Sequence, residues 1–263
     1  MKIVVLISCM NEKDYSIIER TNLKTDAVII NQTDNDSVQS VEFLSSDGNK
    51  HNAIFVNTRE RGLSKSRNMA IEYSGGADVC LLCDDDEWLD DDYEEKISKA
   101  YTDAPSDIKL IAFAFTMEGH SCPTESHKFT FKDIMRTSSV QISFKREAII
   151  SNNIKFDILM GSGTGNGGGE ENKFLIDVKK AGLSMMYVPY YITTVQKGNS
   201  KWNNSISERY LRNLGWSSRR ILGFTGGVAY IIYHAVSHYR AYSSQFGIHS
   251  ILSNMIKGFF DKR

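Results

Sequence analysis

The chain has 263 residues, a formal net charge of −1 and a pI of about 6.6. This near-neutral balance supplies no overall positive field, so we exclude a protein that binds nucleic acid through its global charge. The length suits one sizeable α/β domain with an appendage, and a sequence with only three prolines and no low-complexity tract indicates no disordered linker.

Strands and helices alternate over the first 105 residues. Apolar runs that end in polar residues, with helical segments between them, predict strands over 3–7, 27–30, 53–57 and 77–84 and helices over 64–73 and 91–102. Such alternation is typical of a doubly wound, mostly parallel sheet, in which ligands bind just beyond the carboxyl ends of the strands.

The alternation weakens beyond Pro105. We expect strands over 108–117, 138–144 and 184–188 and a helix over 171–181. Just before this helix, six glycines fall within the nine residues 161–169. They predict either a mobile loop that closes over bound substrates or a surface loop without a role.

The C-terminal region, from about residue 206, differs from the rest. Residues 221–236 are apolar and aromatic but are interrupted by glycines and a histidine, which falls short of a membrane span of about 20 residues. Basic residues flank this run and the apolar run 251–260. Apolar helices with basic flanks fit an anionic membrane surface, and the alternative is a helical cap packed on the core or on a second subunit.

The most informative motif is the junction between the apolar run 77–83 and four consecutive acids. Because side chains alternate along an extended segment, we expect Asp84 and Asp86 on one side and Asp85 on the other. Carboxylates held together at a strand end favour Mg²⁺ or Mn²⁺, completed by substrate phosphates. The competing interpretation is a solvated charge run, because the acidic stretch continues past the strand end.

The cysteines and the start of the chain favour the cytoplasm. The four cysteines have neither disulfide-framework nor zinc-ribbon spacing. The sequence begins with an apolar strand rather than a cleavable signal pattern, so we expect a cytoplasmic protein, peripheral at the membrane if the C-terminal region binds lipid.

Three short motifs follow one another along the chain: Gly62-Leu-Ser-Lys-Ser-Arg67-Asn68, Leu82-Cys-Asp-Asp-Asp-Glu87 and Gly169-Glu-Glu-Asn-Lys-Phe-Leu175. Together they resemble the motifs of family 2 glycosyltransferases with the GT-A fold, over about residues 1–195. The resemblance implies an inverting enzyme that uses a nucleotide-sugar donor and a divalent metal. Ser66 stands where the family usually has alanine, and Glu171, with its longer reach, stands where it usually has aspartate.

Candidate site residues come from the strand ends and from the resemblance. A metal on Asp86, shared with Asp84, would neutralise the leaving diphosphate, and Arg67 would add a fixed cation there. The expected donor-binding residues are Ser8, Asn11, Asp34, Arg67, Asp84 and Asp85. The resemblance implies Glu171 as the general base and Glu170 as an acceptor contact, although two acids at a helix start are equally explained by the helix dipole. Trp202 and Trp216 are candidates for stacking on a sugar, or for ordinary core packing.

The sequence thus predicts an α/β, GT-A-like fold with a helical C-terminal appendage. We expect a glycosyltransferase domain over 1–205, with a nucleotide-sugar half (1–105) and an acceptor half (106–205), followed by the helical region 206–263. The expected function is metal-dependent transfer from a nucleotide sugar, with uridine diphosphate as the favoured carrier, to a saccharide or lipid-linked acceptor in surface polysaccharide synthesis. The alternatives are a sugar nucleotidyltransferase and a non-catalytic cation-binding module; oligomers through the C-terminal helices stay open.

Overall fold

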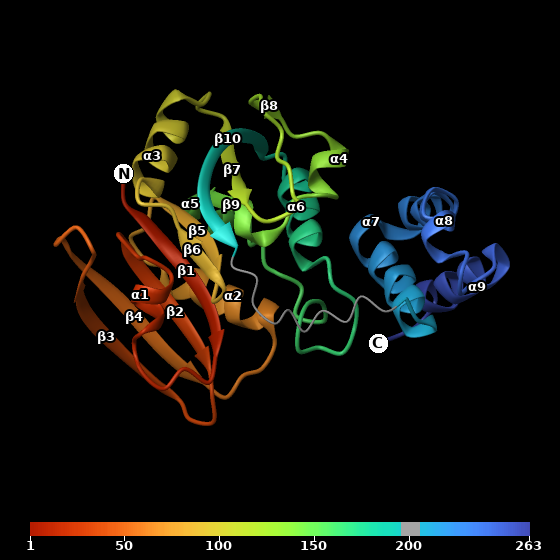
Figure 1. The fold of residues 1–263 in the computed structure, drawn as a ribbon, viewed down its shortest axis with the longest axis horizontal. Coiled ribbons are helices and arrows are strands. Elements are labelled where there is room, and N and C mark those ends of the chain that lie inside the picture. The colour runs from red at the N-terminus through yellow and green to blue at the C-terminus, as the bar shows by residue number, and fades with distance from the viewer. Residues whose placement is uncertain (196–205) are drawn as a thin grey trace.

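The computed structural model describes residues 1–195 and 206–263. Its centre is one mixed sheet with the strand order β3-β4-β2-β1-β5-β9-β7-β10-β6, and β8 pairs with β10 (Figure 1). The strands are β1 Ile3–Met10, β2 Asp26–Gln32, β3 Ser37–Leu44, β4 Lys50–Thr58, β5 Val79–Asp84, β6 Glu87–Leu89, β7 Ile108–Thr116, β8 His127–Lys128, β9 Ile142–Lys145 and β10 Ser184–Val195.

Helices cover both faces of this sheet. The helices described by the structure are α1 Ile17–Arg20, α2 Leu63–Tyr73, α3 Tyr93–Asp103, α4 Phe131–Ile134, α5 Arg146–Ser151, α6 Glu170–Lys180, α7 Glu208–Ser237, α8 Tyr239–Tyr242 and α9 Ile248–Phe259, with a 3₁₀ turn at Ser139–Gln141. This two-sided cover is why the central strands read as continuous apolar runs.

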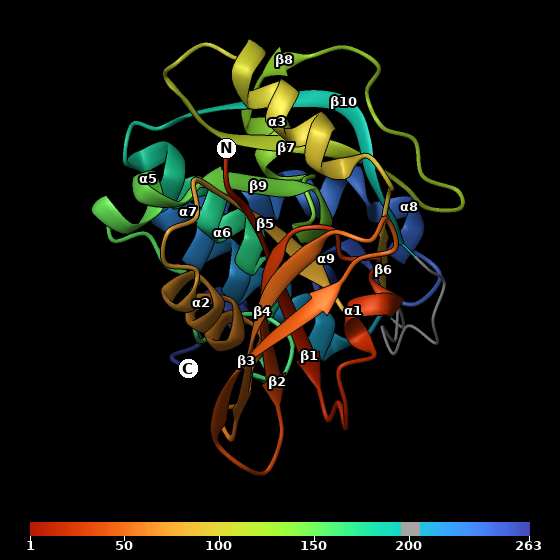
Figure 2. The ribbon, with the colours of Figure 1, turned by 90° about the vertical axis from the view of Figure 1, so that its left-hand side faces the viewer.

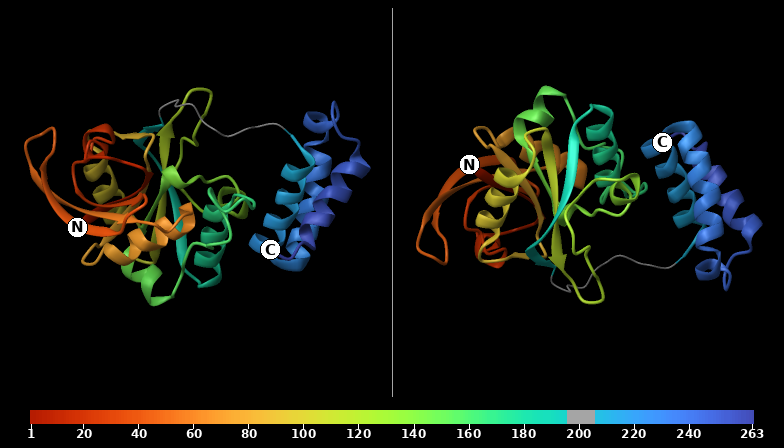
Figure 3. Two further views of the ribbon diagram at one scale, coloured as in Figure 1. Left: turned by 90° about the horizontal axis from the view of Figure 1, so that it is seen from below. Right: turned by 90° about the horizontal axis from the view of Figure 1, so that it is seen from above.

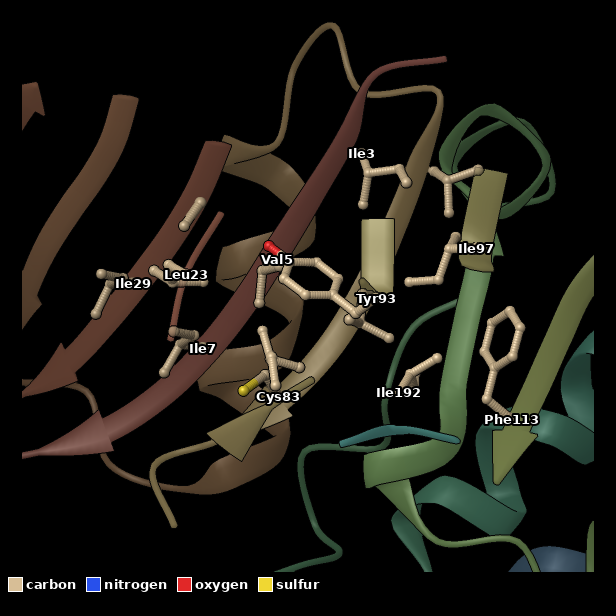
Figure 4. Close-up of a cluster of buried hydrophobic side chains, with 14 of the residues drawn as sticks. Ile3, Val5, Ile7, Leu23, Ile29, Cys83, Tyr93, Ile97, Phe113 and Ile192 are labelled. Atoms are coloured by element: carbon tan, nitrogen blue, oxygen red, sulfur yellow. The ribbon is translucent and has the colours of Figure 1, made fainter. Parts of the chain in front are cut away.

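Two apolar cores lie on opposite faces of the sheet, and β1 contributes side chains to both. Val5 and Ile7 belong to the core that contains Tyr93 of α3, as Figure 4 shows. Val4 belongs to the other core, beneath α2 and α6. Because successive side chains of a strand point to opposite faces, one buried strand supplies both cores.

The carboxyl ends of β4, β2, β1 and β5 meet at one edge of the sheet, since these neighbours pair in parallel. The expected GT-A-like α/β fold with a helical C-terminal region is therefore confirmed. The sequence did not reveal β3, which pairs antiparallel with β4 and is largely exposed. The segment 138–144 starts as a 3₁₀ turn, and its strand β9 runs antiparallel between β5 and β7.

The C-terminal helices form a group of their own beside the sheet (Figures 1 and 3). α7 is broken at Gly223, which has φ 72° and ψ −165°. α7 and α9 pack backbone to backbone: a Cβ on Gly215 would lie 1.8 Å from the Met255 carbonyl oxygen, and only glycine permits this approach. None of the described helices is apolar over enough length to cross a bilayer.

The same helices also join the main body. Trp216 and Ile221 of α7 are buried in the core beneath α6, and Arg220 pairs with Asp157. Trp216 is 4% exposed, so it packs in the core rather than offering its ring to a sugar. Trp202 and the expected boundary between residues 205 and 206 fall at or within the segment 196–205, outside the described residues.

Candidate active site

The acidic strand end consists of the last residue of β5 and a short turn. β5 ends at Asp84, Asp85 and Asp86 form the turn, and β6 begins at Glu87. The expected alternation of Asp84 and Asp86 along an extended strand does not apply, because the chain turns at Asp85. Partial burial and the neighbouring carboxylates raise the pKa of both Asp85 and Asp86.

Arg67 joins the three sequence motifs. Its guanidinium, only 3% exposed, donates to both carboxylate oxygens of Asp84 at 2.9 and 3.3 Å and to Oε1 of Glu170 at 3.1 Å. It also lies over the ring of Phe156, 5.5 Å from the centroid. A buried cation requires such paired partners. Arg67 was expected at the donor diphosphate; here its guanidinium holds two carboxylates that lie far apart in the sequence.

The two acids at the start of α6 have different surroundings. Glu170 is buried and paired with Arg67. The next residue, Glu171, is half-buried, and burial together with the charge of Glu170 raises its pKa from 4.5 to about 8. A carboxylate with such a pKa accepts a proton more readily than an ordinary glutamate. The acceptor contact expected for Glu170 stays a prediction, since Arg67 occupies its carboxylate here.

Two further residues, which the sequence analysis did not select, form hydrogen bonds to Asp84 at the strand end. Glu87 is 1% exposed; its carboxylate accepts from the backbone N–H of Asp84 at 2.6 Å and from the hydroxyl of Thr193 at 3.1 Å. Burial and the charge of Asp84 raise the pKa of Glu87 well above its usual range. Ser139 donates its hydroxyl to Asp84 at 3.0 Å. Glu87 was visible only as part of an acidic run, and Ser139 gave no sequence signal because β9 brings it here from a distant segment.

Ser8 lies next to this strand end. It is buried, it is the register partner of Asp84 in the pairing of β1 with β5, and its hydroxyl accepts from Ser66 at 2.8 Å. The serine that replaces the usual alanine at position 66 therefore ties α2 to β1. This bond supports the position of Arg67, the next residue of α2.

Asn11 and Asp34 follow the ends of β1 and β2 along the same edge. Asn11 is exposed, has φ 57°, and donates its backbone N–H to the carbonyl of Gln32 at 3.1 Å. Asp34 is highly exposed and pairs with Arg61 at 2.7 Å. Both side chains are open to solvent at the edge where the sheet topology predicts a ligand.

The glycine-rich loop 161–169 lies between α2 and α7. On one side the carbonyl of Ser162 accepts from the backbone N–H of Leu63 at 3.0 Å, and a Cβ on Gly163 would lie 3.2 Å from the Cα of Gly62. On the other side Ser217 of α7 donates to the carbonyl of Gly168 at 3.0 Å. The expectation of a mobile loop therefore needs qualification: in this structure the loop bonds to elements on both sides.

The residues present fit a metal cation whose coordination is completed by the bound substrate. Within 1–195 and 206–263, no three or more His, Cys, Asp and Glu side chains are arranged to hold a metal by themselves. Partial burial and the charge of Asp84 raise the pKa of Asp86, whose side chain is exposed, and a hard cation shared by these two carboxylates would relieve their repulsion. Mg²⁺ and Mn²⁺ commonly use one or two carboxylates plus substrate phosphates, so such a site is compatible with this turn.

Comparisons with known proteins agree with this geometry. Residues 5–164 match the model of glycosyl transferase family 2. The glycosyltransferase GlyA of Streptococcus pneumoniae is 28% identical over 117 residues, which are 41% of this chain and 16% of the relative, so the chain spans only a small part of that protein.

Two solved structures share the fold. TarS 1–349 of S. aureus in complex with UDP-GlcNAc has a TM-score of 0.66 at 13% identity, over 98% of this chain and 80% of that one. A mannosyltransferase of Pyrobaculum calidifontis in complex with GDP-Man and Mn²⁺ has a TM-score of 0.50 at 12% identity, over 98% and 73%. The family match covers more than half of the sequence, so the chain belongs to glycosyl transferase family 2.

Proposed function

We propose that this enzyme transfers a sugar, with inversion, from a uridine diphosphate sugar to a hydroxyl of a saccharide or lipid-linked acceptor in surface polysaccharide synthesis. The observation that carries the proposal is the buried pairing of Arg67 with Asp84 and Glu170. It brings the donor-side strand end and the first turn of α6 to one site. The TarS complexes with UDP and UDP-GlcNAc support uridine diphosphate as the first carrier to test.

The reaction is a single displacement. The acceptor oxygen bonds to the anomeric carbon while the bond from that carbon to the phosphate oxygen breaks, and the nucleoside diphosphate leaves with the electron pair. Glu171 takes the proton of the acceptor hydroxyl. Its raised pKa suits this role, because a general base works best when its pKa lies near the operating pH.

The strand end holds the leaving group. Asp86 and Asp84 would hold Mn²⁺ or Mg²⁺, which supplies positive charge to the departing diphosphate. Asp85 contacts the donor, and Ser8, Asn11 and Asp34 bind the nucleoside end along the same edge. Arg67 keeps Asp84 and Glu170 at a fixed separation, so the metal side and the proton-accepting side are positioned together.

The test is a panel of nucleotide sugars with and without Mn²⁺, followed by thermal unfolding and by calorimetry. We expect one uridine diphosphate sugar to raise the unfolding temperature in the presence of metal and to release UDP when an acceptor is supplied. Release of pyrophosphate when the enzyme is instead given UTP and a sugar 1-phosphate would indicate nucleotidyl transfer. Absence of any nucleotide affinity would leave a cation-binding module.

A further inference from the structure

The second half of α7 exposes a broad uncharged face to solvent. Between Ile221 and Tyr239 the chain contains no Lys, Arg, Asp or Glu. The exposed side chains of this face are large and apolar, with Ile232 56%, Tyr233 64% and Val236 68% exposed. Phe224 and Val228 extend the face toward the break at Gly223.

The face continues onto α9 and into a groove. The ring of Phe224 meets that of Phe260 at the end of α9, with centroids 6.4 Å apart. A groove of about 620 Å³ runs along the inner side of the helix between α6 and α7. The residues that line the groove include Tyr230 and Tyr233, together with Lys179 and Lys180. An apolar surface thus lies beside two exposed amines.

The C-terminal region 206–263 and the rest of the chain carry net charges of opposite sign. Residues 206–263 contain eight Lys and Arg and two acids, a net charge of +6. The remaining residues 1–205 contain 23 Lys and Arg and 30 acids, a net charge of −7. A second copy docking through the same face would bring two positive regions together, whereas an anionic bilayer complements the charge.

We propose that the outer face of α7, with the end of α9, is a docking surface for an anionic phospholipid bilayer. The apolar face lies in the boundary between headgroups and acyl chains, parallel to the membrane, since no described helix is long and apolar enough to cross it. Arg219, whose guanidinium lies 5.1 Å from the centroid of the Phe259 ring, and Lys179 and Lys180 contact the lipid phosphates. This surface operates whatever sugar the active site transfers.

The experiment sediments the full chain with vesicles of phosphatidylcholine alone or mixed equally with phosphatidylglycerol. We expect binding only to the anionic vesicles, and weaker binding as salt rises from about 0.1 to 1 M, because screening shortens the range of attraction from ~10 to ~3 Å. The double variant Ile232→Asp/Val236→Asp should bind at least ~10-fold more weakly, since it lacks two aliphatic side chains that would be buried in the bilayer.

A matched control is Leu44→Asp. Leu44 is 66% exposed on the edge strand β3, and β3 lies at the opposite end of the molecule from α7 (Figures 1 and 2). Its replacement should leave vesicle binding unchanged. Both variants should unfold at the wild-type temperature, because the replaced side chains are exposed. Equal binding of wild type and double variant, or no binding to anionic vesicles, overturns the proposal. A wild-type dimer that the double variant converts to a monomer would assign the face to self-association instead.

Discussion

The strand end after β5 and the first turn of α6 are built alike but differ in burial. Each has consecutive acids, and each gives one of them, Asp84 or Glu170, to the guanidinium of Arg67. In each case a nearby acid has a raised pKa: Asp86, two residues after Asp84 in an exposed turn, and Glu171, directly after Glu170 in a half-buried helix start.

The difference in burial separates two kinds of chemistry. An exposed pair of carboxylates relieves its repulsion most readily by binding a cation, since solvent and phosphate oxygens complete the coordination. A half-buried carboxylate beside another acid relieves the repulsion between the two charges by taking up a proton. In the proposed mechanism, one arginine therefore keeps the cation-binding acids and the proton-accepting acid at a fixed separation.

The largest effect should come from the proton-binding side. Glu171→Gln keeps the shape of the side chain but removes its basicity, so turnover should fall by about 10²–10⁴-fold. Affinity for UDP with Mn²⁺, measured by calorimetry, should stay at the wild-type value because the strand end is untouched. Near-normal turnover of the variant with its acceptor would place the base elsewhere.

Removing the shared partner should damage both sides at once. Arg67→Ala leaves Asp84 and the buried Glu170 uncompensated, and we expect the free energy of unfolding to fall by about 3–5 kcal/mol in urea titrations. The control is Lys50→Ala, which breaks the exposed pair with Glu42 and should cost no more than about 1 kcal/mol. Equal costs for the two variants would mean that the buried network contributes no special stability.

The exposed turn is tested by Asp86→Ala. We expect the Mn²⁺-dependent part of UDP binding to weaken at least ~10-fold, because one of two carboxylates for the cation is lost. The fold should persist, as the side chain is exposed. Asp92→Ala, in the same acidic run but beyond β6, should bind UDP normally. If Asp86→Ala retains full metal-dependent affinity, the cation does not use this turn.

The last prediction concerns the dependence of stability on pH. Glu171 has a higher pKa in the folded state than the 4.5 of an ordinary glutamate, so the folded chain holds this proton more tightly than the unfolded chain. Ionisation of Glu171 therefore costs stability as pH rises from about 4.5 toward 8. Glu171→Gln should become progressively more stable than wild type across this range. A stability difference that does not change with pH would show that Glu171 titrates normally.

The sequence by itself determined the buried parallel strands, the helices α2, α3 and α6, and the order of the motifs. Apolar runs ending in polar residues located β1, β2, β4 and β5, because a strand buried on both faces requires continuous apolar side chains. The acids of 170–171 marked the start of α6 through their interaction with the helix dipole. Such signals reside in neighbouring residues, so they can be recognised without the fold.

Only the tertiary structure decided how the acids are used. The ion pairs of Arg67 join residues 17 and 103 positions away, and Ser139 reaches Asp84 across 55 positions. The turn at Asp85 likewise depends on Glu87, whose carboxylate bonds to the Asp84 N–H and to Thr193 of β10. Burial and long-range pairing decide the pKa values and partners of these acids, and the spacing of residues along the sequence encodes neither. Desolvation changes the pKa of a side chain only when distant segments of the chain surround it.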